Sequence, residues 1–165
     1  MIQESQTDTA STPSGRAGIA FTAIQVVLGI LGTIDAGLLY MLDTKRVDLP
    51  CTADGGCEKV ADSIYSQVHP FGHTVPIALL GVVGYVVILS LAMAKAASET
   101  KRGVDLLSMA LTLVTGGAFL YSWFLQYVSF TMIHAHCMYC IISACLMTVL
   151  FITCVLERRA LARSV

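Results

Sequence analysis

Charged residues are scarce in this 165-residue chain, where Asp, Glu, Lys and Arg together occupy 13% of the positions. A soluble domain carries about 25% charged residues, which it needs to cover a surface that faces water. The ten basic residues do not outnumber the eleven acidic ones, so the chain also lacks the basic face that binds nucleic acid. Apolar residues occupy 56% of the positions, which excludes disorder and indicates a small integral membrane protein.

Four apolar segments are long enough to cross a bilayer. A spanning helix needs about 20 mostly apolar residues to cross about 30 Å of hydrocarbon. The segments that meet this length are residues 17–42, 75–96, 106–133 and 137–156. The first segment is longer than the apolar core of a signal peptide, and no small-residue cleavage site follows it. We therefore expect an all-α integral membrane fold, a bundle of four transmembrane helices.

The basic residues predict how this bundle is oriented. In a chain with four spans, the two termini and the connection at 97–105 share one side. Six of the ten Lys and Arg residues fall in these segments, and Lys95, at the end of the second span, is the seventh on that side. Such an excess marks the cytoplasmic side. We expect a disordered cytoplasmic tail at 1–16, a basic cytoplasmic tail at 157–165 and a long external loop at 43–74.

Four of the six cysteines lie at or beyond the predicted external face, where disulfides persist. Cys51 and Cys57 lie in the external loop, and Cys137 and Cys140 form a Cys-x-x-Cys at the start of the fourth span. Residues three apart on a helix share a face, and the N–H groups that begin a helix favour a thiolate. The Cys-x-x-Cys therefore predicts a redox pair. The loop pair predicts either a mobile redox shuttle or a structural disulfide.

Other interpretations of the cysteines remain open. Cys145 and Cys154 lie deeper in the fourth span without an evident mate, so we interpret them as packing residues. His and Cys are also zinc and copper ligands, and His134 and His136 directly precede the Cys-x-x-Cys. A membrane protein that handles soft metals with the same Cys and His residues is therefore the alternative to a redox enzyme.

The joint order of these motifs resembles bacterial homologues of vitamin K epoxide reductase, in a stand-alone form without a thioredoxin domain. The resemblance runs from Leu39 to Cys154. Its motifs are Leu-Tyr-x-Leu at 39–42, Cys…Gly-Cys-Glu…Ser at 51–63, Val-Pro-Ile-Ala-Leu-Leu-Gly…Gly-Tyr at 75–85 and Cys-x-x-Cys-x-x-Ser at 137–143. The resemblance implies a membrane enzyme that oxidises protein thiols and reduces a quinone, either ubiquinone or menaquinone.

The resemblance also assigns a role to each of the four cysteines. It implies that Cys140 lies beside the quinone and that Cys137 is its partner in the active-site disulfide. Cys57 would exchange with Cys137, and Cys51 would receive electrons from an external dithiol protein.

Further site residues follow from the same resemblance. Ser63 matches a Ser/Thr that supports the active site, and the stretch 63–73 occupies the place of a short half-helix that lies over it. Ser143 matches a hydroxyl position near the quinone, and Ile77 and Leu80 are candidate quinone-binding residues at the start of the second span.

Two positions bear on the substrate. Animal enzymes that act on vitamin K epoxide carry a Tyr directly after the hydroxyl position, where this sequence has Ala144. They carry an Asn where this sequence has Ile77. The resemblance therefore favours quinone reduction over epoxide reduction.

The resemblance implies a partner and a location as well. Some bacterial relatives are fused to a thioredoxin domain, whereas this sequence ends at Val165. We therefore expect a DsbA-like or other thioredoxin-fold protein of the periplasm to act in trans. We expect the protein to lie among the lipids of the bacterial inner membrane as a multi-pass protein. Both termini would be cytoplasmic, and the active site would face the periplasm or the cell exterior.

Three polar residues inside the predicted spans are further candidates. Ionisable residues within a span are rare and are functional candidates. Asp35 lies about two helical turns inside the external end of the first span, where it would either donate a proton to the quinone or only reach toward the interface. Gln126 and Tyr127 would either hydrogen-bond a quinone carbonyl or pack between helices.

Overall fold

The structure, a computed structural model, describes residues 13–44, 67–68, 75–134 and 137–163. The long helices are α1 (Pro13–Asp43), α3 (Ile77–Ala96), α4 (Lys101–Val128) and α5 (Met138–Arg163). The π-helical turn η3 (Ser129–Ile133) continues α4, and β1 (Gln67–Val68) and β2 (Val75–Pro76) are short strands. Within the described ranges, four helices are long and apolar enough to cross a membrane. The expected all-α fold with four spans is therefore confirmed.

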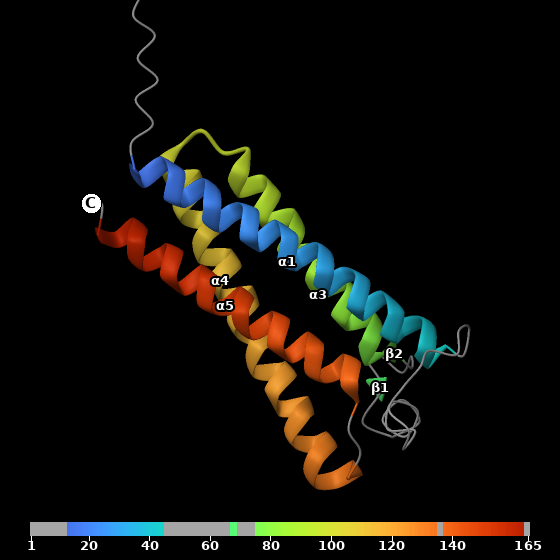
Figure 1. Ribbon diagram of the computed structural model, residues 1–165. Coiled ribbons are helices and arrows are strands. Elements are labelled where there is room, and N and C mark those ends of the chain that lie inside the picture. Colours follow the sequence, from blue (N-terminus) through green and yellow to red (C-terminus); the bar gives the residue numbers. More distant parts are fainter. Residues whose placement is uncertain (1–12, 45–66, 69–74, 135–136, 164–165) are drawn as a thin grey trace, which may run out of the picture.

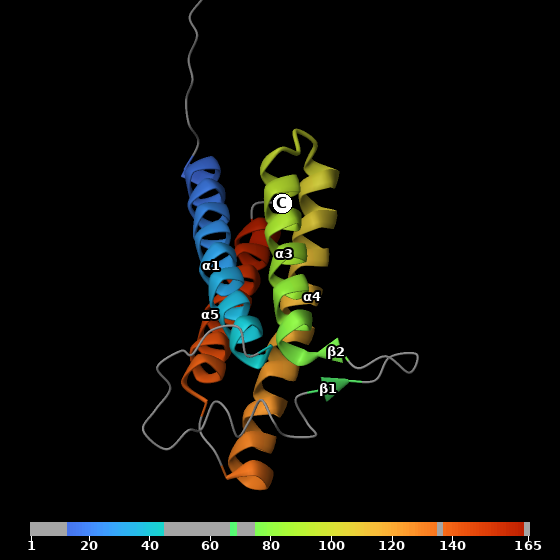
Figure 2. The same cartoon turned by 90° about the vertical axis from the view of Figure 1, so that its right-hand side faces the viewer.

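The four helices form a ring in which each helix packs against two others. Helix α1 packs against α3 and α5, and α4 packs against the same two helices, so α3 and α5 lie diagonally opposite each other. Successive helices run in opposite directions (Figure 1). We call the end where α5 begins the Cys137 end, and the end where α3 finishes the Lys95 end. The end of α1, the strands and the start of α3 all lie at the Cys137 end (Figures 1 and 2).

The core of the bundle is small, and its outer surface is apolar. Tyr85, Ile88, Leu111 and Leu150 are almost completely buried between the helices. Many other large apolar side chains, such as Leu120, are exposed. A soluble protein rarely exposes so much contiguous apolar surface, whereas lipid is a suitable environment for it.

Three of the described helices extend beyond the predicted spans. Helix α1 begins at Pro13 and α5 continues to Arg163, so parts of the expected tails at 1–16 and 157–165 are helical. Helix α4 already begins at Lys101 because the Thr100 hydroxyl accepts a hydrogen bond from the Gly103 N–H at 3.2 Å, an N-cap. Hydropathy marks only the membrane-facing part of a helix, so the polar turns at these ends escaped prediction.

The half-helix expected at 63–73 is not helical at the two of its residues that the structure describes. Gln67 and Val68 form β1, which is antiparallel to β2 and pairs Val68 with Val75. Pro76 gives a physical reason, because its extended backbone (φ -60°, ψ 135°) prevents α3 from starting earlier and leaves an extended segment to pair with. The remainder of 63–73 lies outside the described residues.

Candidate functional site

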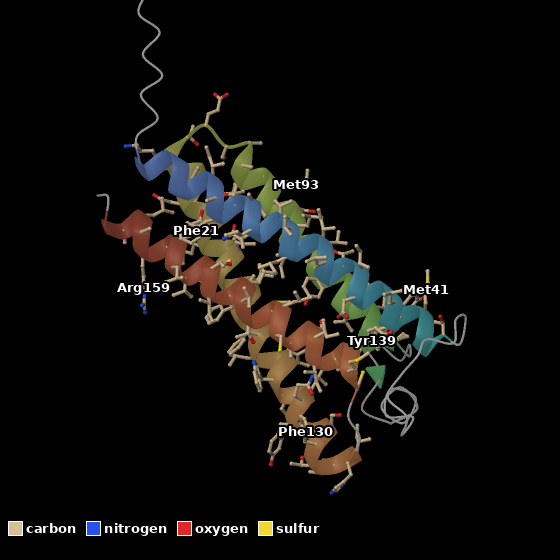
Figure 3. All side chains as sticks on the ribbon, viewed as in Figure 1. Phe21, Met41, Met93, Phe130, Tyr139 and Arg159 are labelled. Carbon is tan, nitrogen blue, oxygen red and sulfur yellow. The ribbon has the colours of Figure 1, made fainter. Side chains whose placement is uncertain are left out.

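Cys137 occupies the position immediately before α5. Its carbonyl oxygen accepts the first helical hydrogen bond, from the Ile141 N–H at 3.1 Å. Its Sγ accepts a second one, from the Cys140 N–H at 3.3 Å. Both bonds are those of a helix N-cap residue, with sulfur in place of the usual side-chain oxygen. Figure 3 shows Tyr139, which lies between the two cysteines, at the same end of the bundle as Met41.

The two cysteines differ in exposure. Cys137 is 1% exposed, whereas Cys140 is half-buried. The first N–H groups of a helix lack helical partners, and their partial positive charge stabilises an anion placed against them. The N–H groups at the start of α5 therefore face the Cys137 sulfur, and Cys140 is the more exposed sulfur of the pair.

The segment before the Cys-x-x-Cys ends in an uncommon backbone conformation at His134. Helix α4 ends in the π-helical turn η3, and His134 then adopts a left-handed conformation (φ 53°, ψ 36°). Such a conformation is uncommon for a residue other than glycine, and it ends the helix at this position.

A second group of polar side chains lies deeper in the bundle. Ser143 is three residues after Cys140, about one helical turn along the same face of α5. The Tyr85 hydroxyl lies 3.1 Å from the Ser143 Oγ and donates to the Ser143 carbonyl oxygen at 3.1 Å. The Asp35 carboxyl lies close to the Ser143 side chain. We call these three residues the Asp35 cluster; they come from α1, α3 and α5.

Gly32 makes room for this cluster. A Cβ at position 32 would overlap the ring of Tyr85, so the ring can pack against α1 only because no side chain is present there. Asp35 follows three residues later on the same face of α1. The close approach of α1 and α3 at Gly32 thus places the Tyr85 hydroxyl near the diagonally opposite helix α5.

A further polar group lies toward the Lys95 end. The Lys95 Nζ contacts both carboxylate oxygens of Glu157, at 2.7 Å and 2.9 Å, and the Gln25 Oε1 at 2.6 Å. The Gln25 Nε2 donates to Glu157 at 2.9 Å and contacts the Cys154 Sγ at 3.5 Å. All four residues are buried. We call Gln25, Lys95 and Glu157 the Lys95 clamp.

The clamp corrects part of the sequence interpretation. Lys95 counted among the basic residues that predict orientation, yet it is buried and paired with an acid. Glu157 fell in the expected basic tail, but it is buried in the continuing helix α5. Opposite charges at the same end of two spans were the available signal for this pair. Cys154 lies in the core as expected, and Cys145 is exposed on the outside of α5.

The structure brings together only some of the predicted site residues. Asp35 and Ser143 meet, and Tyr85 joins them, although the sequence had assigned no role to this tyrosine. A tyrosine hydroxyl inside an apolar span needs a partner, which was the signal for it. Tyr127 and Leu80 are 63% and 46% exposed, so they do not contribute to the buried cluster.

Other predictions receive no test from the described part of the chain. Cys51, Cys57 and Ser63 lie outside the described residues, as does His136 of the possible metal site. His134 is exposed. Among the residues that the structure does describe, no group of three or more His, Cys, Asp or Glu side chains is placed to hold a metal ion. Gln126 is buried and Ile77 half-buried, and their part in quinone binding stays a prediction.

Comparison with known proteins identifies the family. Residues 23–155 match the vitamin K epoxide reductase family, and this range includes the Asp35 cluster and the Cys-x-x-Cys. Comparison with curated proteins found no match. The matched range covers well over half of the chain. The chain therefore belongs to the vitamin K epoxide reductase family, whose enzymes are quinone-dependent thiol oxidoreductases.

Proposed function

We propose that the protein is a membrane thiol oxidase that makes disulfides in a thioredoxin-fold protein and passes the electrons to a quinone. The observation that carries the proposal is the position of Cys137 and Cys140 at the N-terminus of α5, where the Cys140 N–H donates to the Cys137 Sγ at 3.3 Å. This redox pair lies at one end of an apolar four-helix bundle. A quinone, which is soluble in the membrane, and a dithiol protein, which is soluble in water, can therefore reach it from different sides.

In the proposed mechanism, electrons pass between two cysteine pairs. A thiolate of the reduced partner attacks the Cys51–Cys57 disulfide at Cys51, and the resulting mixed disulfide resolves to leave the partner oxidised. The freed Cys57 thiolate then attacks Cys137, which releases Cys140. Resolution of this second mixed disulfide leaves Cys137 and Cys140 reduced. The partner has then lost two electrons and two protons to the enzyme.

A quinone supplies the acceptor for these two electrons and two protons. The chain fits such a molecule in its chemistry, because a quinone is an apolar ring with carbonyl oxygens that accept hydrogen bonds. The apolar bundle suits the ring, and the Asp35 cluster offers a carboxyl and two hydroxyls. Oxidation of the Cys137 and Cys140 thiols restores the active-site disulfide.

The partner and the location belong to the same proposal. Helix α1 ends and β2 begins at the Cys137 end, so the loop with Cys51 and Cys57 joins the bundle there. The excess of basic residues supports a cytoplasmic location for the other end. We propose a bacterial inner membrane protein whose Cys137 end meets a DsbA-like protein outside the cytoplasm, with ubiquinone or menaquinone as the acceptor.

The test is quinol formation by the purified protein with a reduced DsbA-like protein and water-soluble ubiquinone and menaquinone analogues. Cys140→Ala is expected to abolish quinone reduction, because the sulfur beside the quinone is lost. Cys51→Ala is expected to block turnover with the protein dithiol while leaving turnover with a small dithiol. Absorbance of the quinone measures both rates.

Cys145→Ser provides the matched control, since Cys145 is an exposed thiol on the same helix. We expect it to turn over at the wild-type rate. Wild-type rates in both Cys140→Ala and Cys51→Ala would refute the proposed function.

A further inference from the structure

Asp35 is a buried acid with an unsatisfied oxygen. It lies within the apolar span Gly18–Met41 and is 8% exposed, and its Oδ2 has no hydrogen-bond partner. A polar atom without a partner in such surroundings costs free energy, so its presence requires an explanation. The contrast with the Lys95 clamp is informative, because there both charged groups are paired.

An interface role does not explain Asp35. Its position is eight residues before the end of α1, about two helical turns inside the bundle. Burial shows that the carboxyl turns into the bundle rather than toward water. The unpartnered oxygen therefore faces the inside of the bundle.

Ser143 connects this carboxyl to the redox pair. Its hydroxyl lies close to the Asp35 carboxyl, and it lies about one turn after Cys140 on the same face of α5. Tyr85 fixes Ser143 through contacts of 3.1 Å with both its Oγ and its carbonyl oxygen. Hydroxyls both donate and accept hydrogen bonds, so Ser143 can pass a proton between its two sides.

We propose that Asp35 is the carboxylic acid that protonates the quinone, with Ser143 and Tyr85 as the residues that position it. The inference rests on the proposed function, in which electrons leave through Cys140. A carboxyl that is kept from water and has one oxygen without a partner is suited to hold a proton and to release it to an oxygen that gains negative charge.

The protons and electrons balance in this reduction of the quinone. When Cys137 and Cys140 form their disulfide, two S–H bonds break, one S–S bond forms, and two electrons and two protons are released. One proton passes through Ser143 to Asp35, replacing the proton that Asp35 has given to a quinone oxygen. The other goes to the second oxygen. Two O–H bonds thus form, and Asp35 ends the cycle protonated, as it began.

The test uses Asp35→Asn, which keeps the size of the side chain but cannot deliver a proton in this way. We expect quinol formation to fall about 100-fold, the usual scale for loss of a general acid. The loss should appear in kcat rather than in KM for the quinone. Asp105→Asn, at an exposed acid at the other end, should leave the rate unchanged.

A second readout does not depend on turnover. Infrared difference spectra with and without a ubiquinone analogue should show a carboxylic acid C=O band that shifts when the quinone is added. Asp35→Asn should remove the band, Asp35→Glu should move it, and Ser143→Ala should alter its frequency because the hydroxyl beside Asp35 is lost. A merely structural Asp35 would give no quinone-dependent band.

The outcomes separate this inference from the proposed function. If the wild-type protein fails to reduce quinone, the proposed function is wrong. If the wild type reduces quinone but Asp35→Asn is equally fast, or no quinone-dependent carboxyl band is found, only the inference about Asp35 is overturned. Thiol–disulfide exchange with the partner, measured without quinone, should be unchanged in Asp35→Asn. If that variant does not fold, the wild-type and Asp35→Glu spectra decide.

Discussion

At the residue scale, Gly32 and Cys137 both control the geometry of the site, and Cys137 also takes part in its chemistry. The missing side chain at Gly32 lets the ring of Tyr85 lie against α1. The Cys137 Sγ accepts a hydrogen bond from the Cys140 N–H at the start of α5. Each role can be separated from redox chemistry by a small substitution.

Gly32→Ala should destabilise the protein and slow quinol formation. The added Cβ overlaps the ring of Tyr85, and overpacking of this kind costs about 1–3 kcal/mol in the free energy of unfolding. Displacement of Tyr85 also moves its hydroxyl away from Ser143. Thermal unfolding in detergent and the quinol assay measure the two effects.

Gly37→Ala is the control, because a Cβ at position 37 of the same helix meets no atom within 4 Å. It should leave both the unfolding temperature and the rate close to wild type. Equal behaviour of the two alanine variants would show that the close approach at Gly32 is unimportant.

Cys137→Ser and Cys137→Ala should differ in stability but not in activity. Serine retains an acceptor for the Cys140 N–H, whereas alanine leaves the first turn of α5 without one. The loss of an N-cap acceptor costs about 0.5–2 kcal/mol. Both variants lack the sulfur and should fail to form quinol from the protein dithiol. Identical unfolding of the two variants would contradict the capping role.

At the scale of helices, polar side chains link the diagonal pair α3 and α5 across the bundle. Tyr85 reaches Ser143 toward one end, and Lys95 reaches Glu157 toward the other. The Lys95 clamp also includes Gln25 of α1. Its hydrogen bonds therefore join α1, α3 and α5 at the same depth in the bundle.

Lys95→Met should destabilise the bundle strongly. It leaves the Glu157 carboxylate buried without its cation, and breaking a buried pair on one side costs about 3–5 kcal/mol. The double variant Lys95→Met/Glu157→Leu removes both charges and should recover much of this loss. Chemical unfolding of the single and double variants forms the double-mutant cycle.

Lys101→Met is the control for the clamp, since Lys101 is exposed at the start of α4. It should change the free energy of unfolding by less than about 0.5 kcal/mol. A double variant as unstable as the sum of its single variants would show that Lys95 and Glu157 are not coupled.

The helices were more predictable than their ends. Long apolar runs predict spans directly, because the bilayer fixes their length. The start of α4 depends on a single capping hydroxyl at Thr100, and the start of α3 depends on Pro76. The extended pairing of Val68 with Val75 depends on where Pro76 stops the helix, and the half-helix that the resemblance implies within 63–73 stays a prediction for the other residues of that stretch.

The part of the site that lies within one motif could be predicted from the sequence. The part formed by residues far apart in the chain was harder to predict. The Cys-x-x-Cys places its two sulfurs through local helix geometry alone. Asp35 and Ser143 were each candidates, but 108 residues separate them in the chain, and nothing local indicates that they touch. Tyr85 escaped assignment for the same reason, because its role depends on the space above Gly32.

At the scale of the whole molecule, the protein meets lipid along its spans and water at its ends. Its outer surface is apolar along the spans, and its Cys137 end is where the cysteine loop joins. The central claim is that electrons from a protein dithiol cross this boundary to a quinone through Cys137 and Cys140. On such a path, each disulfide that forms in the partner is accompanied by the formation of one quinol.

The most direct test measures both products together in purified protein reconstituted in lipid nanodiscs. With a reduced DsbA-like protein and excess ubiquinone analogue, we predict one quinol for each disulfide formed, and neither product with Cys140→Ala. Disulfide formation that continues without quinone, or quinol formation that persists in Cys140→Ala, would contradict the account.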